Sequence, residues 1–527
     1  MPVIQDLTTG KTVTCEAGEL LLPVLQKHKI YVNNACNGKG TCGKCKVTLL
    51  KGRASKMSEH EASMLSEEEI AGGVRLACMT QVTEDITVRT QNDTTAMKVL
   101  SAGFIPEFEK EKGLAGYGIA IDIGTTTVAL SLVRLSDGEI IEKAAGMNSQ
   151  RTYGQDVLTR ITYEMETGEE GISNLQKAVV DSTNQAVKSM CAAAGVEVSE
   201  IVAYSIAGNC TMTHMVLGVD ARSIGVAPYK PAFLKAQNRK AAEVGLIGSP
   251  EATVYCLAQV SGYIGGDILA GAYVCDLKHQ EKNCLFLDIG TNGEMVLAGN
   301  GRLVSCSCAA GPALEGMNIT SGMPALPGAI ERVEIKDEKV FIGCIGEQPP
   351  EGICGSGILE VVSELIRTGF VKPTGAFVKK KKLSEDDWRP QFLIEDENGS
   401  AFVLAQGVLV TQKDVRQVQL AKGAILSGFR SLLKQANISV EDLDEVIIAG
   451  QFGSHLSAQA LAGAGIIPRE AESKVRYVGN TSKTGAYMAL LSGKVRKEME
   501  ELAEDIDYFE LAESEGYETL FMECMRF

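Results

Sequence analysis

The chain has 527 residues, too many for one hydrophobic core, so we expect two to four domains. Hydrophobic residues make up 45% and charged residues 22%, as in globular proteins, and a formal net charge of −16 argues against nucleic acid as a partner. No run approaches the roughly eighteen apolar residues of a membrane-spanning helix, and the N-terminal MPVIQDLTTG lacks the basic and apolar parts of a signal peptide. We therefore expect a cytoplasmic protein with no membrane partner.

The charge is unevenly distributed along the chain. Residues 1 to 95 carry eleven Lys and Arg against eleven Asp and Glu, so the remaining residues hold the whole negative excess. This difference in composition predicts a separate N-terminal module.

A cluster of cysteines marks this module. Residues 36 to 45 read CNGKGTCGKC, and Cys78 follows in VRLACMTQV. Among fifteen cysteines in a reducing compartment, a tight cluster indicates metal or redox chemistry rather than disulfides. Four thiolates can hold two bridged irons, whereas zinc ribbons usually bring two C-x-x-C pairs and only one is present. We predict a 2Fe-2S cluster, with zinc as the alternative, on four ligands: Cys36, Cys42, Cys45 and Cys78.

Glycines separate these cysteines, which suits a loop that wraps closely around an anionic cluster. The motifs CNGKGTCGKC and RLACM resemble the 2Fe-2S ferredoxin family, in the variant with five residues between the first two ligands. The resemblance covers residues 1–92 and implies a β-grasp fold that transfers one electron at a time. Residues 93–116 mix polar, charged, Gly and Pro residues without a sustained period, and we predict a linker there.

A repeated pattern follows the linker. YGIAIDIGTTTVALSLVRLSDGEII predicts a strand ending at Asp122, a Gly/Thr turn and two further strands, and CLFLDIGTNGEMVLAGNGRLVSC repeats this around Asp288. The spacing of 166 residues indicates an internal duplication. We expect one unit over 117–527, with a first lobe near 117–280, a second near 281–490 and a C-terminal tail.

The chemistry of a DIGT turn is readable from its residue types. A carboxylate at a strand end reaches a metal ion directly or through water, and Thr hydroxyls and backbone amides face an anion. We predict that Asp122 and Asp288 position Mg²⁺ and an attacking water. The residues expected at the phosphates of a nucleotide are Gly124, Thr125, Thr126, Gly290, Thr291 and Asn292.

Two further glycine-rich segments, GICGSGILEVVSELI and VIIAGQFGSHL, predict turns that lead into helices. With the DIGT turns they resemble the sugar kinase, Hsp70 and actin superfamily over residues 117–490, which implies an α/β fold of two lobes closing over ATP. The residues then expected near adenosine or its phosphates are Gly355, Ser356, Gly450 and Gly453. Asp267 and Glu294 are candidates for a general base, although a helix-start carboxylate is the commoner explanation for Asp267.

The combination of a ferredoxin module with IDIGTTT, YGQDVLTRI, LDIGTNGE, GICGSG and IIAGQFG resembles the reductive activators of corrinoid proteins. The resemblance implies an ATP-dependent enzyme that returns Co(II) to Co(I) in a corrinoid protein of an anaerobic methyltransferase system, with an upstream low-potential electron donor. Some members carry an extra domain before the actin-like part or C-terminal 4Fe-4S clusters. The last 21 residues here hold one cysteine, Cys524, so the ferredoxin-bearing members are the relevant comparison.

Other functions remain open from the sequence. One is a small-molecule kinase whose ferredoxin module senses redox state, and another is an electron carrier or interaction protein that binds ATP as a structural ligand. A radical-dehydratase activator is disfavoured because such proteins bridge a 4Fe-4S cluster between subunits. The sequence also leaves open whether the chain forms a homodimer.

Overall fold

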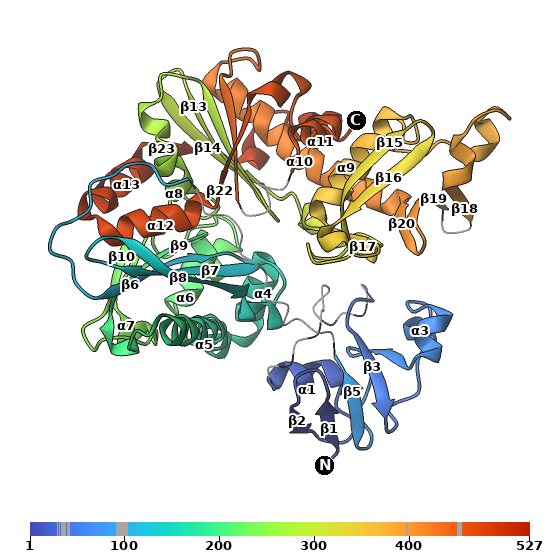
Figure 1. Ribbon diagram of the computed structural model, residues 1–527, viewed down its shortest axis with the longest axis horizontal. Coiled ribbons are helices and arrows are strands. Elements are labelled where there is room, and N and C mark those ends of the chain that lie inside the picture. The colour runs from blue at the N-terminus through green and yellow to red at the C-terminus, as the bar shows by residue number, and fades with distance from the viewer. Residues whose placement is uncertain are drawn as a thin grey trace.

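The computed structural model describes residues 1–28, 30, 32, 38, 40, 43–90, 104–396, 399–450 and 456–527. Their strands form an N-terminal five-stranded sheet, two six-stranded sheets and two small three-stranded sheets (Figure 1). In this part of the chain no helix is long and apolar enough to cross a membrane. The multidomain α/β and α+β architecture is as the sequence predicts.

The N-terminal sheet has the strand order β2-β1-β5-β3-β4. Strands β1 and β5 pair in parallel and the other neighbours are antiparallel. Helix α1 (Leu21–Lys27) buries its leucines and Val24 in the core of this sheet, which completes a β-grasp fold. The strands are β1 (Val3–Asp6), β2 (Thr12–Thr14), β3 (Lys46–Lys51), β4 (Val74–Leu76) and β5 (Ile86–Arg89), and the short helices α2 (Glu59–Ala62) and α3 (Glu67–Ala71) precede β4.

The first six-stranded sheet has the order β10-β11-β9-β6-β7-β8. Strands β6, β7 and β8 form an antiparallel meander, and β9 and β11 extend the sheet in parallel with β6. The strands are β6 (Tyr117–Ile123), β7 (Thr127–Arg134), β8 (Glu139–Met147), β9 (Ile201–Gly208), β10 (Gln237–Lys240) and β11 (Thr253–Cys256). Between β8 and β9 lie α4 (Val157–Thr167) and the long α5 (Glu169–Ala194).

Residues of β6 alternate between two cores. Ile119, Ile121 and Ile123 pack in the core that includes α5, whereas Ala120 packs in the core that includes α8 (Gly266–Val274) and α12 (Thr481–Leu491). This alternation follows from the two-residue period of a strand and explains why β6 reads as an almost continuous apolar run.

The second six-stranded sheet repeats the topology of the first. Its order is β22-β21-β12-β13-β14-β23, again an antiparallel meander of three strands extended by parallel strands on the side of the first. The strands are β12 (Cys284–Ile289), β13 (Gly293–Gly299), β14 (Arg302–Cys308), β21 (Glu445–Ala449), β22 (Val475–Gly479) and β23 (Ile506–Tyr508). The repeated order β8-β7-β6-β9-β11 and β14-β13-β12-β21-β22 is the duplication that the sequence predicts.

Helices α8 and α12 lie between the two large sheets, as Figure 1 shows for α12. Residues of both sheets and both helices form one apolar core, which includes Ala120 of β6 and Phe286 of β12. The helices approach closely because α12 carries Gly485, where an added Cβ would lie 2.4 Å from the Cβ of Ala270 in α8. The two lobes are therefore joined through a dry, tightly packed layer.

Further elements are inserted between β14 and β21. They form the sheet β16-β15-β17 and the sheet β18-β19-β20, with α9 (Gly355–Arg367) and α10 (Gln412–Ala436). The strands are β15 (Ala329–Lys336), β16 (Lys339–Cys344), β17 (Gly352–Ile353), β18 (Leu393–Asp396), β19 (Gly399–Ala405) and β20 (Val408–Thr411). Their apolar residues merge with those of the second large sheet into one core.

Residues beyond 490, which the sequence predicts as a tail, form helices and a strand that pack against the rest of the protein. After α13 (Gly493–Asp505), β23 pairs in parallel with β14 at the sheet edge, and α14 (Tyr517–Cys524) packs on α10. A three-residue strand leaves too short a pattern to be seen in the sequence. In the predicted linker, the structure describes the residues from Phe104 onward. Among them, Phe108 packs edge to face against Tyr487 of α12.

Substituting Gly485 by alanine tests the close approach of α12 and α8. The added methyl group cannot move away from Ala270 without displacing α8, so we expect the free energy of unfolding to fall by about 1–3 kcal/mol. The measurement is the urea midpoint followed by circular dichroism. Gly146→Ala in β8 is the control, because its methyl group would meet no atom within 4 Å. Equal midpoints for the two variants would contradict this packing argument.

Candidate functional site

The described part of the cysteine cluster brings two thiols together. Cys45 directly precedes β3 and Cys78 lies two residues beyond β4, and both are buried. Their Sγ atoms are 3.2 Å apart, close to the roughly 3.8 Å that two thiolates on one tetrahedral metal ion would have at metal–sulfur bonds of about 2.3 Å. Cys36 and Cys42 lie outside the described residues.

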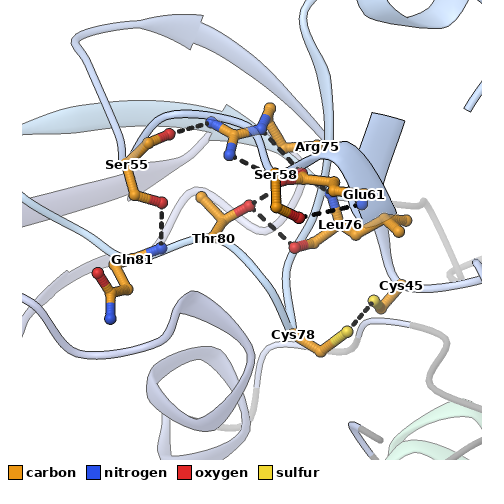
Figure 2. A network of polar contacts seen from close by, with 9 residues as sticks. All are labelled: Cys45, Ser55, Ser58, Glu61, Arg75, Leu76, Cys78, Thr80 and Gln81. Carbon is orange, nitrogen blue, oxygen red and sulfur yellow. Dashed lines mark hydrogen bonds and ion pairs between the residues drawn. The ribbon is translucent and has the colours of Figure 1, made fainter. Parts of the chain in front are cut away.

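A buried ion pair fixes the strand that carries Cys78 (Figure 2). Glu61 accepts hydrogen bonds of 2.8 and 2.9 Å from the guanidinium of Arg75, and another of 2.9 Å from the amide of Leu76. Thr80 donates to the carbonyl of Leu76, which closes the turn around Cys78. The turn that carries Cys78, a predicted cluster ligand, is thus held in place by this charged network.

The described glycines of this segment, Gly38, Gly40 and Gly43, all have a positive φ, which glycine adopts readily. Gly40 has φ +72°, and a Cβ there would lie 2.5 Å from Cε of Met79, the neighbour of Cys78. Its carbonyl lies 3.0 Å from Nε2 of His60. Gly40 therefore lies close to the residue after Cys78 in a backbone conformation that favours glycine, and the buried thiols of Cys45 and Cys78 fit an iron-sulfur cluster.

The second group of predicted residues lies where the two large sheets end. Asp122 and Asp288 occupy equivalent positions near the ends of β6 and β12, and each is followed by its DIGT turn. Glu294 is the direct partner of Asp288 across the β12–β13 pair. Asp267 begins α8 and accepts a 2.9 Å hydrogen bond from the amide of Ile268, so the helix-start explanation describes its geometry.

These carboxylates share one desolvated place. Burial, with repulsion from Asp122, raises the pKa of Asp288 and of Asp267 to about 7. Burial raises the pKa of Glu294 well above its usual range, with repulsion from Asp267 and Asp288 adding to it. Burial also raises the pKa of Asp122. Repulsion of this kind between neighbouring carboxylates favours binding of a cation there.

Asp122 is held by a segment far along the chain. Nδ2 of Asn480 and Oγ of Ser482 each donate a 2.7 Å hydrogen bond to its carboxylate. Both belong to the start of α12, in the stretch GNTSKTG. Lys483 in the same turn is buried, which lowers its pKa, while the charge of Asp122 raises it.

The first DIGT turn is supported from below by polar side chains. Asn148 donates to the carbonyl of Gly124, and Asn209 donates to Oγ1 of Thr125. Arg160, which is fully buried, donates a 2.6 Å hydrogen bond to the carbonyl of Thr125. Burial lowers the pKa of Arg160 to about 9. Keeping the positive charge of its guanidinium in this buried place therefore costs free energy, and the charge lies close to the turn.

The two DIGT turns meet at one residue. Oγ1 of Thr291 donates a 2.7 Å hydrogen bond to Glu315, and Oγ1 of Thr126 makes a longer contact of 3.4 Å with its other oxygen. Thr126 and Thr291 are 165 residues apart, so the structure brings together threonines from the DIGT turns of both repeats. Asn292 makes a side-chain hydrogen bond to Glu294.

Of the two glycine-rich segments, one lies close to the carboxylates. Gly450 directly follows β21 with φ +87°, and a Cβ there would lie 2.6 Å from Oδ1 of Asp288. Gly355 and Ser356 begin α9, but the Ser356 hydroxyl contacts Sγ of Cys354 inside the core. Gly453 lies outside the described residues. Gly450 is thus placed at the carboxylates, whereas Ser356 faces the protein interior.

No three His, Cys, Asp or Glu side chains of the described ranges converge closely enough to hold a metal ion by themselves. This agrees with the preference of Mg²⁺ for water and phosphate oxygens beside one or two carboxylates. The residue set fits Mg²⁺ only together with a phosphorylated ligand.

Several residues of this site are not among those that the sequence predicts. Asn480, Ser482 and Glu315 reach it from segments distant in sequence, and Arg160 lies within the YGQDVLTRI motif without having been singled out. The stretch GNTSKTG between a strand and a helix was a usable signal, because polar residues at a helix start often cap it or bind anions. Glu315 left no local signal.

Three family models match the chain. The N-terminal residues 4–83 match a 2Fe-2S iron-sulfur cluster binding domain. Residues 117–280 match the RACo middle region, and residues 282–527 match the C-terminal domain of RACo, the ASKHA domain. The first of these models favours iron over zinc at the cysteines.

A solved structure decides the family. The reductive activator for corrinoid, iron-sulfur protein matches with a TM-score of 0.70 and 30% identity, over 100% of this chain and 98% of that one. The chain belongs to the reductive activators of corrinoid proteins. Curated relatives of this activator are the corrinoid activation enzyme RamQ of Eubacterium limosum and the [Co(II) methylated amine-specific corrinoid protein] reductase of Methanosarcina barkeri. Identity to RamQ is 34% over 74% of the activator chain and 66% of RamQ, and to the reductase 26% over 77% and 76%.

Replacing Arg160 of this activator by lysine tests the support of the first DIGT turn. Lysine keeps the charge but lacks the planar fork, so the bond to the carbonyl of Thr125 is lost and the turn loosens. We expect the affinity for Mg-ATP to fall about tenfold or more, measured by titration calorimetry. Arg222→Lys is the control, since that guanidinium pairs with Asp220 at the surface. Unchanged affinity in Arg160→Lys would refute this role.

The raised pKa of Asp288 predicts a pH-dependent stability. Because the folded-state pKa of about 7 exceeds the unfolded value near 4, the native state loses stability as pH rises between these values. Asn at this position stays neutral. We expect Asp288→Asn to match the wild type near pH 4 and to exceed it by about 1 kcal/mol or more at pH 8 without nucleotide. Urea midpoints from the fluorescence of Trp388, the single tryptophan, measure this, and a difference independent of pH would contradict it.

Proposed function

We propose that this activator returns the cobalt of a corrinoid protein from Co(II) to Co(I), using one electron from its 2Fe-2S cluster and ATP bound between its two lobes. A low-potential donor would reload the cluster after each transfer. The observation that carries this proposal is the full-length match to a reductive activator, combined with a pair of buried thiols and a group of buried carboxylates at the DIGT turns of the same chain.

The two parts are needed for a physical reason. A ferredoxin-type cluster has a potential near roughly −400 mV, and Co(I) is a strong reductant, so transfer to Co(II) runs uphill. Each 100 mV of uphill transfer costs roughly 2.3 kcal/mol per electron. ATP supplies the free energy when its binding or hydrolysis favours a complex in which the cobalt is easier to reduce.

The chain's own residues have separable roles in this scheme. Cys45 and Cys78, with Cys36 and Cys42, would ligate the cluster. Asp122, fixed by Asn480 and Ser482, and Asp288 would orient water around the cation that accompanies ATP. Mg²⁺, when bound with ATP, neutralises phosphate charge.

Asp267 and Glu294 would accept a proton from that water, because both have raised pKa values and lie beside Asp288. The threonines of the DIGT turns would donate to the phosphates, and Gly450 would admit the nucleotide close to Asp288. Lobe closure would then move the two sheets about the layer of α8 and α12.

The test is an anoxic reduction assay. Dithionite-reduced protein is mixed with a Co(II) corrinoid protein of a methyltransferase system, and Co(I) absorbance is followed with and without Mg-ATP. We expect Co(I) only with Mg-ATP, and its loss in both Cys78→Ser and Asp288→Ala. Cys78→Ser should also lose the cluster's visible absorbance while retaining nucleotide binding, and Asp288→Ala should do the reverse.

One result would count against the proposal. Continued ATP hydrolysis with cobalt remaining Co(II) across several corrinoid partners would favour the kinase or redox-sensor function. Cys344→Ser is the matched control, because this partly buried cysteine lies in β16 outside both sites and its substitution should leave Co(I) formation unchanged.

A further inference from the structure

Glu315 stands where the two DIGT turns face each other. It ends the short turn Pro312–Glu315, which follows β14 in the second repeat. One carboxylate oxygen accepts from Thr291 at 2.7 Å, and the other contacts Thr126 of the first repeat at 3.4 Å. An anionic group of the protein itself therefore bridges the two turns in this structure.

The threonine hydroxyls cannot serve two acceptors at once. Each hydroxyl has a single proton to donate, so a bond to Glu315 excludes a bond from the same proton to a phosphate oxygen. A carboxylate and a phosphate are both anions that favour such charge-assisted bonds. Phosphate binding to Thr126 and Thr291 therefore requires that the hydrogen bonds from these hydroxyls to Glu315 break.

The residues on both sides of Glu315 in the sequence are packed against the protein, and they fix its position. Ala313 and Leu314 are buried in the second-lobe core. Gly316, with φ +78°, would place a Cβ 2.8 Å from the carbonyl of Met323 and 3.4 Å from the amide of Gly355. The turn is pinned on both sides, and the carboxylate is presented between the lobes.

The charge around Glu315 makes the bridge easy to displace. Asp288 lies near enough that Glu315 contributes to its raised pKa, and burial raises the pKa of Glu315 itself. The bonds from the hydroxyls of Thr291 and Thr126 and from the backbone amide of Thr291 act in the opposite direction. The carboxylate is thus held mainly by the donors that a phosphate would claim.

We infer that Glu315 is a latch: it occupies the phosphate position between Thr126 and Thr291 when no nucleotide is bound, and a nucleoside di- or triphosphate binds by displacing it. The latch rests on the proposed function, since it needs ATP to bind between the lobes. It gives the protein a direct link between phosphate binding and the contact that joins its two repeats.

The test is nucleotide affinity in the full-length protein with its cluster. Glu315→Ala and Glu315→Gln remove the competing charge, so we expect both to bind Mg-ADP and the non-hydrolysable Mg-AMPPNP about tenfold more tightly than the wild type, by titration calorimetry. Adenosine, which has no phosphate, should bind equally to all three proteins. Glu498→Gln is the matched control, because Glu498 accepts a 2.5 Å hydroxyl bond from Tyr273 between α13 and α8, away from the turns.

A double-mutant cycle ties the effect to the hydroxyl. In a Thr291→Val background the competition at Thr291 no longer exists, so the gain from Glu315→Ala should shrink several-fold. The thermal midpoint of each variant reports folding, and a variant that is destabilised yet binds more tightly still supports the latch.

The outcomes separate the latch from other roles. Unchanged affinity with slower hydrolysis would make Glu315 part of the hydrolytic machinery, and weaker affinity in both variants would make it a structural support; either result overturns the latch alone. If the wild type binds neither Mg-ADP nor Mg-AMPPNP, the nucleotide site of the proposed function fails together with the latch.

Discussion

The structure depends on burying acidic groups at the point where two duplicated sheets face each other. Asp122 and Asp288 stand at equivalent strand ends, and Asp267 and Glu294 join them from α8 and β13. Placing these charges together is unfavourable, as the raised pKa values of Asp288 and Asp267 show. The packing of α8 and α12 between the sheets helps to hold the carboxylates close. A cation with an anionic ligand would relieve the repulsion, in accord with the proposed binding of nucleotide here.

In the N-terminal module, buried charged groups also set the geometry of a site, which here is a pair of thiols. Cys45 and Cys78 are brought within 3.2 Å by a turn that the buried pair of Glu61 and Arg75 fixes. Here charge stabilises the scaffold next to the two thiols. In the proposed function the protein combines this redox site with carboxylates that bind nucleotide, and electron transfer driven by ATP requires both.

Much of this was predictable from local sequence patterns. The DIGT turns were recognisable because an apolar strand, a carboxylate and a Gly/Thr turn follow each other within a few residues, and the copy at Asp288 removed the ambiguity of a single motif. The cysteine spacing was recognisable for the same reason, and residues 4–83 match a 2Fe-2S cluster binding domain. Asn480 was hidden, because its bond to Asp122 spans 358 residues. Glu315 was hidden too, since nothing around it in sequence distinguishes it from an ordinary surface acid.

The sequence by itself determined the kinds of parts: a ferredoxin module, two repeated strand-and-turn units and their acidic strand ends. These are fixed by backbone propensity and side-chain alternation, which act over a few residues. Only the tertiary structure decided which side chains share the cleft. Arg160 lies under Thr125, Glu315 lies between the two turns, and Ser356 faces the core, because packing between distant segments sets those positions. Convergence of this kind depends on the balance of burial and repulsion across the whole fold, and no short stretch of sequence contains it.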